Sequence, residues 1–178
     1  LHRIIRIMNN KMIRLVMTDI DGVWTDGGMY YSDNGFEMKK FSTSDSAGVL
    51  FLKELNIPIY IITGEVSDCV QLRARKLGIS GVFMGIKNKL DCGKKICNEN
   101  NIDLSEAAYI GDDIYDIPLL REVGLSACPS NSPSYVKEIV DVVLTRNGGD
   151  GAFREFVEKC VLTRENISML IESLIKQF

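Results

Sequence analysis

The chain lacks three features that would each point directly to a class of protein. It has no apolar run approaching the roughly 20 residues of a membrane span, so we expect no membrane partner. It has no basic excess, because 21 Lys and Arg stand against 24 Asp and Glu, which argues against a nucleic-acid partner. Its five cysteines are odd in number and include no Cys-x-x-Cys pair. Such cysteines are typical of reduced cytoplasmic thiols, so we expect a cytoplasmic protein without a disulfide framework.

The length of 178 residues suits one domain with a sizeable core of its own. Residues 1–11 mix basic and apolar side chains and are too short and too interrupted for a secretory signal. We expect a mobile tail over 1–11 that precedes a single domain over 12–178.

Short apolar runs alternate along the chain with segments of helical period. The runs predict strands over 13–17, 57–62, 81–84, 107–110, 124–127 and 140–144. The segments between them predict helices over 46–55, 67–77, 89–100, 117–123 and 134–139. This alternation predicts the α/β fold class, with a doubly wound, mostly parallel, Rossmann-like sheet. Ligands of such sheets bind at the carboxyl ends of the strands.

Two segments fall outside that alternation. Ser32-Asp33-Asn34-Gly35 lies between the apolar-rich stretches 29–31 and 36–41, and its Asn-Gly pair is a strong hairpin signal. The hairpin follows the first strand directly, so we expect a protruding flap and no separate cap domain. Apolar residues at helical spacing over 167–178 predict a C-terminal helix that packs in the core or against a second subunit.

Two carboxylates leave the first strand together. Asp19 and Asp21 are two residues apart, so the alternation of a strand aims them to the same side. Like charges at this separation repel and need a cation or a shared proton. A hard divalent ion with oxygen ligands, Mg²⁺ above all, fits best. The alternative is an Asp-Gly turn that merely closes the strand.

Further polar groups fall at the ends of the next three strands. They are Thr63-Gly64 after the second, Lys89 after the third, and Gly111-Asp112-Asp113 with Asp116 after the fourth. Taken singly, they would be a turn, a solvated helix residue and a helix cap. Their succession at strand ends favours phosphoryl transfer through an aspartyl phosphate.

The residue types suggest separate roles in such a reaction. Asp19 would attack the phosphate, while Asp21 would protonate the leaving alkoxide and later deprotonate water. Mg²⁺ held by Asp19 and Asp112 would screen the charge repulsion between carboxylate and phosphate. Lys89 and Thr63 would bind phosphoryl oxygens.

These motifs resemble those of the haloacid dehalogenase superfamily of phosphatases. The run Asp19-Ile20-Asp21-Gly22-Val23-Trp24-Thr25-Asp26-Gly27 looks like its capless branch, which acts on sugar-acid phosphates. The similarity extends from Met12 to about Glu158 and includes the segments 42–48, 85–89, 111–113 and 148–155.

The resemblance implies roles for further residues. Asp19, Asp112 and the Asp21 carbonyl would bind Mg²⁺, with Asp113 and Asp116 behind them. Thr63, Gly64 and Lys89 would bind phosphate, and the segment Ser42, Thr43, Ser44, Asp45 and Ser46 would lie where sugar hydroxyls are read. The branch usually forms a homotetramer in which flaps meet and a neighbour helps to close the site. The run 148–155 would reach toward that neighbour, or would be a glycine-rich turn before a helix.

The residue after Thr63-Gly64 bears on the substrate. Many octulosonate phosphatases carry Arg at this position, whereas this chain has Glu65. The combination of Glu65 with Lys76 resembles the nononate-phosphatase subtype, and Arg73 is a third candidate contact for the sugar. A glutamate side chain accepts hydrogen bonds from the hydroxyl groups of a polyol substrate, whereas an arginine side chain favours a carboxylate on the substrate. We therefore expect a Mg²⁺-dependent phosphatase of a 2-keto-3-deoxy sugar acid that prefers nononate 9-phosphate, with octulosonate 8-phosphate and N-acetylneuraminate 9-phosphate as alternatives. Glu65 could otherwise simply favour the start of the next helix.

Two rival functions use the same fold. One is a non-catalytic, phosphatase-like module for oligomerisation, which the intact set Asp19, Asp21, Thr63, Lys89 and Asp112 disfavours. The other is a phosphotransferase or mutase, which normally needs a lid to exclude water.

Overall fold

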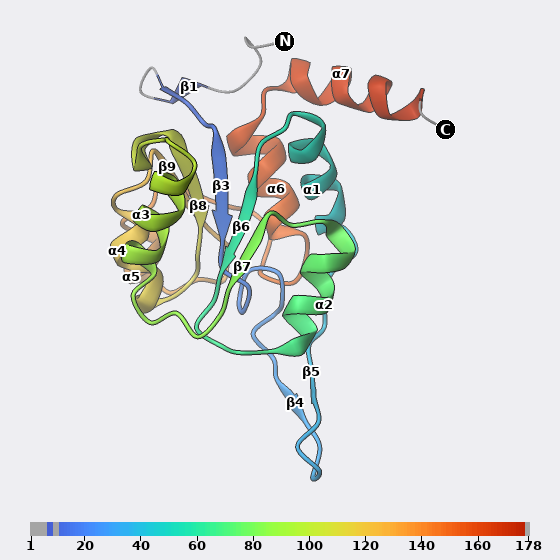
Figure 1. Cartoon of the computed structure of the whole chain (residues 1–178), viewed down its shortest axis with the longest axis vertical. Coiled ribbons are helices and arrows are strands. Elements are labelled where there is room, and N and C mark those ends of the chain that lie inside the picture. Colours follow the sequence, from blue (N-terminus) through green and yellow to red (C-terminus); the bar gives the residue numbers. More distant parts are fainter. Residues whose placement is uncertain (1–6, 9–10, 177–178) are drawn as a thin grey trace.

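A six-stranded parallel sheet forms the centre of the molecule. The computed structural model describes residues 7–8 and 11–176, and the strand order is β10-β9-β8-β3-β6-β7 (Figure 1). The strands are β3 (Leu15–Thr18), β6 (Ile59–Ile62), β7 (Gly81–Phe83), β8 (Ala107–Ile110), β9 (Leu125–Cys128) and β10 (Val142–Val143). Every neighbouring pair is parallel, which confirms the predicted doubly wound α/β class.

Helices cover both faces of this sheet (Figure 1). One face carries α1 (Asp45–Glu54), α2 (Asp68–Leu77), α6 (Ala152–Phe156), the π-helical turn η3 (Val157–Val161) and α7 (Arg164–Ile175). The other face carries α3 (Lys89–Glu99), α4 (Ile117–Leu120) and α5 (Ser134–Lys137). Two 3-10 turns, η1 (Leu104–Glu106) and η2 (Ile114–Asp116), flank β8 in sequence.

The central strand β3 takes part in two separate cores. Val16 packs among the apolar residues beneath α1 and α6, whereas Leu15 and Met17 pack among those beneath α3 and α4. All three side chains are fully buried, as expected for a parallel strand that is covered on both faces.

The path of the chain creates a crevice at the end of β3. From β3 the chain proceeds outward through β6 and β7, and then returns to β8 on the other side of β3. At such a reversal the loops leave the sheet in opposite directions, which opens a ligand crevice at the carboxyl ends of the strands. Asp19 directly follows β3 and therefore lies at this point.

The predicted hairpin forms and protrudes from the carboxyl end of the sheet (Figure 1). Its strands are β4 (Tyr30–Tyr31) and β5 (Glu37–Met38), and Gly35 N donates to Ser32 O at 2.9 Å across the turn. Gly35 has φ 79°, a conformation that favours glycine at the turn. Over 11–176 this flap is the only insertion between β3 and α1, and no cap domain is present.

The N-terminal segment is described in part. Strands β1 (Ile7–Met8) and β2 (Lys11–Met12) pair antiparallel, so these positions belong to a ladder. The rest of the expected mobile tail, residues 1–6 and 9–10, lies outside the described residues. All five cysteines are free thiols. Among the described residues, no helix has the length and apolar character needed to cross a bilayer.

Candidate active site

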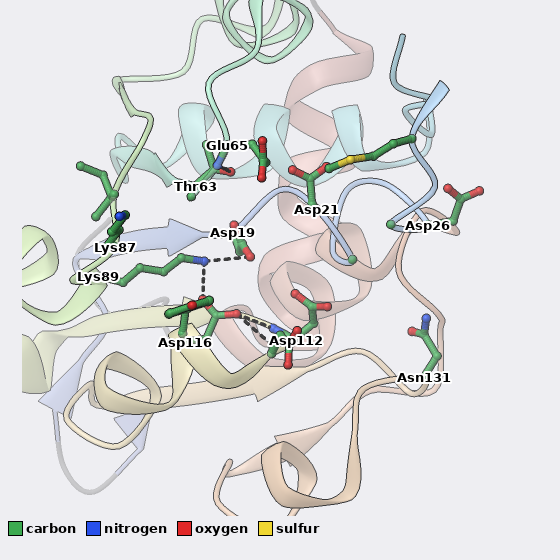
Figure 2. Close-up of a pocket in the computed structure, with 17 residues that line it drawn as sticks. Asp19, Asp21, Asp26, Thr63, Glu65, Lys87, Lys89, Asp112, Asp116 and Asn131 are labelled. Carbon is green, nitrogen blue, oxygen red and sulfur yellow. Dashed lines mark hydrogen bonds and ion pairs between the residues drawn. The ribbon is translucent and has the colours of Figure 1, made fainter. Parts of the chain in front are cut away.

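A cavity of about 560 Å³ opens where the loops after β3, β6, β7 and β8 meet (Figure 2). Its volume lies within the usual range for sites that bind small molecules. It brings together nine of the residues proposed from the sequence: Asp19, Asp21, Thr63, Gly64, Glu65, Lys89, Asp112, Asp113 and Asp116.

Lys89 connects two carboxylates on the floor of this cavity. Its Nζ lies 2.8 Å from Asp19 Oδ2 and 2.6 Å from Asp116 Oδ1. Burial disfavours the ammonium, but the two carboxylates outweigh that effect and raise the pKa of Lys89. The side chain therefore remains a fixed positive charge beside Asp19.

Asp116 accepts hydrogen bonds from several groups beneath the floor of the cavity. Its Oδ1 also accepts from the Tyr109 hydroxyl, and its Oδ2 accepts from the backbone N–H of Asp112 at 2.9 Å and of Asp113 at 3.1 Å. Asp116 is 1% exposed, so these contacts occupy both of its oxygens in a buried position. It holds Lys89 and the loop that carries Asp112. Asp113 instead accepts from the Tyr135 hydroxyl at 2.8 Å, at the edge of the cavity.

Asp19 and Asp112 form a centre of unbalanced negative charge. Carboxylate oxygens of Asp19, Asp112 and Asp116 lie within 4.8 Å of one another, and Asp19 Oδ1 is buried with no partner in the described part of the chain. Burial, followed by repulsion from Asp116, raises the pKa of Asp19 to about 7. Burial, followed by repulsion from Asp19, raises the pKa of Asp112 to about 8. A divalent cation would relieve this repulsion.

Gly22 lets Asp112 approach the loop after β3. Its φ is 84°, and a Cβ at this position would lie 1.9 Å from Asp112 Oδ2. A side chain there would therefore displace the carboxylate from the loop that carries Asp19 and Asp21.

The glycine-rich run 148–155 braces the same loop from behind. Gly149 N donates to Val23 O at 3.0 Å, and a Cβ on Gly148 would lie 1.8 Å from Gly22 O. This placement matches the reading of the run as a glycine-rich turn before a helix, since α6 begins at Ala152. Within one chain, the turn supports the loop that carries Asp19 and Asp21.

Asp21 is held by a residue that the sequence analysis did not identify. Its Oδ1 accepts from Lys39 Nζ at 2.6 Å, while its Oδ2 is buried without a partner among the described residues. Burial disfavours the charged lysine, yet the hydrogen bond that Lys39 donates to Asp21 and the negative charge of Asp21 raise the pKa of Lys39 overall. No spacing pattern in the sequence marks a hairpin lysine as a contact of a strand-end carboxylate.

The proposed sugar contacts other than Glu65 do not line the cavity. They are Ser42, Thr43, Ser44, Asp45, Ser46, Arg73 and Lys76. Asp45 is buried, where its Oδ1 accepts from Arg154 N at 3.0 Å at the start of α6. Burial raises the pKa of Asp45 to about 6.

Arg73 and Lys76 have other surroundings on α2. Arg73 Nη2 donates to Ser46 Oγ at 2.9 Å and to Ser42 O at 3.2 Å. Lys76 is exposed in the last turn of α2, about 12 Å along the helix from its first residue. Among the described residues of one chain, no contact brings Arg73 or Lys76 to the cavity.

Eight further residues line the cavity that were not proposed as contacts. They are Gly22, Asp26, Gly27, Met29, Ile86, Lys87, Tyr115 and Asn131. The first three belong to the motif after β3, and Ile86 and Lys87 belong to the segment before Lys89. Asn131, whose Oδ1 accepts from Gly148 N at 2.9 Å, follows β9 and carries no recognisable signal in the sequence.

Comparison with known proteins assigns the class that the fold and the strand-end carboxylates suggest. A family model of haloacid dehalogenase-like hydrolases matches residues 82–156. The 3-deoxy-D-manno-octulosonate 8-phosphate phosphatase of Haemophilus influenzae is 37% identical over 143 residues, which cover 80% of this chain and 79% of that protein. The chain therefore belongs to the haloacid dehalogenase-like hydrolases, and the resemblance seen in the sequence is confirmed.

Other relatives bear the same enzyme name. The octulosonate 8-phosphate phosphatase of Escherichia coli K12 is 34% identical over 158 residues, covering 89% of this chain and 84% of the relative. The crystal structure of the Moraxella catarrhalis phosphatase, in complex with magnesium, phosphate and a KDO molecule, matches with a TM-score of 0.85 and 34% identity. That match covers 91% of this chain and 93% of the other. A cobalt-bound structure of the Haemophilus influenzae enzyme matches with a TM-score of 0.79 and 34% identity, over 90% and 88% of the two chains.

Proposed function

We propose that this protein is a Mg²⁺-dependent phosphatase that removes the terminal phosphate from a 2-keto-3-deoxy sugar acid. The observation that carries the proposal is the convergence of Asp19, Lys89 and Asp112 at the end of β3. The relatives support it, because they are named as phosphatases of such a sugar acid.

The residues divide the reaction into two steps. An Asp19 carboxylate oxygen attacks phosphorus, the bond from phosphorus to the sugar oxygen breaks, and Asp21 gives its proton to that oxygen. Asp21 then takes a proton from water, whose oxygen attacks the aspartyl phosphate and frees inorganic phosphate and Asp19. Lys89 and the Thr63 hydroxyl bind phosphoryl oxygens throughout.

The donor set fits a magnesium ion. Asp116 has both oxygens engaged, so Asp19 and Asp112 would hold the ion, together with the backbone carbonyl of Asp21. The unpartnered Asp19 Oδ1 and the raised pKa values of Asp19 and Asp112 support this assignment. When bound, Mg²⁺ neutralises negative charge on the carboxylates and the phosphate.

Two substrates of different length have separate support. Glu65 lines the cavity, and its carboxylate makes no hydrogen bond or ion pair with the described residues. It is therefore available to accept hydrogen bonds from a polyol, which favours the nine-carbon nononate 9-phosphate. The names of the relatives favour octulosonate 8-phosphate as the second candidate.

A homotetramer is the assembly we propose. The flap exposes Met29, Tyr30, Tyr31, Phe36 and Met38, each by 39–67%. Exposed apolar side chains along a protruding hairpin suit contact with another subunit. The cytoplasmic location is likewise a proposal, which rests on the cysteine pattern.

Turnover of three compounds tests the proposed function. Octulosonate 8-phosphate, nononate 9-phosphate and N-acetylneuraminate 9-phosphate would be compared with Mg²⁺ and after its removal by a chelator. We expect phosphate release from at least one, loss on chelation, and recovery when Mg²⁺ returns. Asp19→Asn should reduce turnover by about 1,000-fold or more with an unchanged circular dichroism spectrum. If no compound is hydrolysed, or if Asp19→Asn retains Mg²⁺-dependent hydrolysis, the proposal is wrong.

A further inference from the structure

A buried lysine joins the flap to the site. Lys39 directly follows β5, where the hairpin returns to the body of the molecule, and its side chain is 0% exposed. Its Nζ lies 2.6 Å from Asp21 Oδ1 and 3.5 Å from Glu37 Oε1. Lysine seldom gives up contact with water entirely, and does so when a carboxylate compensates for the lost hydration.

The neighbouring lysine provides an internal comparison. Lys40 Nζ lies 2.7 Å from Asp26 Oδ2 in the same loop as Asp21, but the side chains of Lys40 and Asp26 are 61% and 39% exposed. An exposed pair of this kind is screened by water and fixes little. Of these two neighbouring lysines, Lys39 alone combines a short distance to a carboxylate with full burial of its side chain.

The contacts of Asp21 distinguish its two oxygens. Oδ1 accepts from Lys39 and, at 3.4 Å, from the Thr25 hydroxyl. Oδ2 is buried with no partner in the described ranges, and the residue as a whole lines the cavity. A charge-assisted bond to one oxygen restricts rotation of the carboxylate and leaves the other oxygen free to act.

We propose that Lys39 is a positioning residue, whose buried ammonium holds Asp21 Oδ1 so that Oδ2 is the oxygen that exchanges protons with the substrate. This inference rests on the proposed function. As the bond from phosphorus to the leaving oxygen breaks, the proton on Oδ2 passes to that oxygen. The flap thereby controls proton transfer through its anchor at Lys39, and not through its exposed apolar side chains.

The leaving group distinguishes this role from a merely structural one. An alkyl phosphate expels a strongly basic alkoxide and needs the proton, whereas p-nitrophenyl phosphate expels a stable phenolate and does not. Loss of Lys39 should therefore slow transfer of the phosphoryl group from an alkyl ester much more than from the aryl ester. Damage to the fold, to phosphate binding or to the metal site would slow both.

Rapid-quench single-turnover rates with the two esters test the inference. The alkyl ester is the best alkyl phosphate of the wild-type protein, whichever sugar acid that is. For Lys39→Met we expect a loss of about 100-fold with the alkyl ester and less than about 3-fold with p-nitrophenyl phosphate. Lys39→Arg should recover part of the alkyl rate. Lys40→Met, which removes the same charge one residue further on, should leave both rates within about 2-fold.

Each other outcome has a definite meaning. Equal losses with the two esters in Lys39→Met, or no loss with either, would overturn the positioning role while leaving the phosphatase assignment intact. If Lys39→Met is inactive with both esters, the rates of Lys39→Arg decide. Equal losses of the two rates in Lys39→Arg would also overturn the positioning role. A wild-type protein that hydrolyses neither ester would refute the proposed function, and the inference with it.

Discussion

At the scale of single residues, free buried oxygens distinguish Asp19 and Asp21 from Asp116 within the cavity. Asp116 lies in the same cavity as Asp19 and Asp21, but both of its oxygens accept hydrogen bonds from the surrounding protein. Asp19 and Asp21 each keep one buried oxygen without a partner among the described residues. Because a buried, unpaired carboxylate oxygen is costly, its persistence at a cavity points to a ligand or a reaction.

Glu65 tests the choice of substrate at this scale. Replacing it by arginine exchanges an acceptor of hydroxyl hydrogen bonds for a donor that pairs with carboxylates. We expect Glu65→Arg to change the ratio of kcat/KM for nononate 9-phosphate and octulosonate 8-phosphate by about tenfold or more, in favour of the shorter acid. Steady-state kinetics with both compounds measures this ratio.

Val66→Arg is the matched control for that experiment. Val66 is adjacent, 71% exposed and outside the lining of the cavity, so the ratio should stay within about twofold of the wild type. A ratio unaffected by Glu65→Arg would instead place Glu65 among residues that merely suit the start of α2.

At the scale of elements, Glu155 ties α6 to the segment that follows β10. Its Oε1 accepts from the Thr145 hydroxyl at 2.6 Å and from Lys159 Nζ at 2.7 Å, and its Oε2 accepts from Arg146 N at 2.7 Å. Burial opposes its charge, but these bonds prevail and lower the pKa of Glu155 to about 2. The same segment continues into Gly148 and Gly149, which brace the loop of Asp19.

The lowered pKa gives Glu155 a defined dependence on pH. A depressed pKa in the folded state stabilises the protein above the unfolded value of 4.5, and this contribution is lost as the pH falls from 4.5 toward 2. We expect Glu155→Gln to lower the free energy of unfolding by about 2 kcal/mol at pH 7. We also expect the difference from the wild type to shrink over that acidic range. Urea unfolding at a series of pH values measures both effects.

Glu158→Gln is the control at the next acidic position of the same segment. Glu158 pairs with Arg154 at 2.7 Å, but the two side chains are 27% and 41% exposed. Glu158→Gln should lower the free energy of unfolding by less than about 1 kcal/mol at pH 7. Stability curves of Glu155→Gln and the wild type that stay parallel down to pH 2 would contradict the assigned role.

The limits of prediction from sequence are also clearest among the elements. The strand over 107–110 was predicted with the bounds of β8, because its apolar run is short and sharply delimited. The run 148–155 was predicted either to reach toward a neighbour or to be a glycine-rich turn before a helix, and no element was predicted over 156–161. Residues Val157–Val161 form the π-helical turn η3, whose wider winding leaves no distinct pattern in the sequence. The helix over 117–123 ends at Leu120.

The candidate site divides in the same way. Strand ends of a parallel sheet meet at one edge, so Asp19, Thr63, Lys89 and Asp112 could be placed together from their order in the sequence. The contact of Lys39 with Asp21 depends on the path of a hairpin in three dimensions, so this contact could not be predicted from the sequence. The segment from Ser42 to Ser46 was assigned by resemblance, whereas Asp45 forms a bond to the start of α6.

At the scale of the whole molecule, the described part of the chain has a protruding flap and no cap domain (Figure 1). We propose that a neighbouring subunit covers the cavity, and the exposed apolar side chains along the flap suit such a contact. We expect light scattering to give about four times the chain mass of 19.9 kDa. Tyr31→Glu combined with Phe36→Glu should yield smaller species and reduce turnover of the sugar-acid phosphate.

Met169→Glu is the control for this assembly. Met169 is 58% exposed on α7, away from the flap, so its replacement should change neither mass nor turnover. A monomeric wild-type protein with full activity would exclude a site that depends on a neighbour.

The central claim is that Asp19 accepts the phosphoryl group, and acid-quench peptide mapping tests it most directly. Asp21→Asn should trap the intermediate, because removal of the phosphoryl group from Asp19 needs a base. With p-nitrophenyl phosphate as donor and Mg²⁺ present, the peptide that contains Asp19 should gain the mass of one phosphoryl group. In Asp19→Asn the modification should be absent. A phosphoryl group found on another carboxylate, or an Asp21→Asn protein that releases p-nitrophenolate with no phosphoryl group on Asp19, would contradict the account.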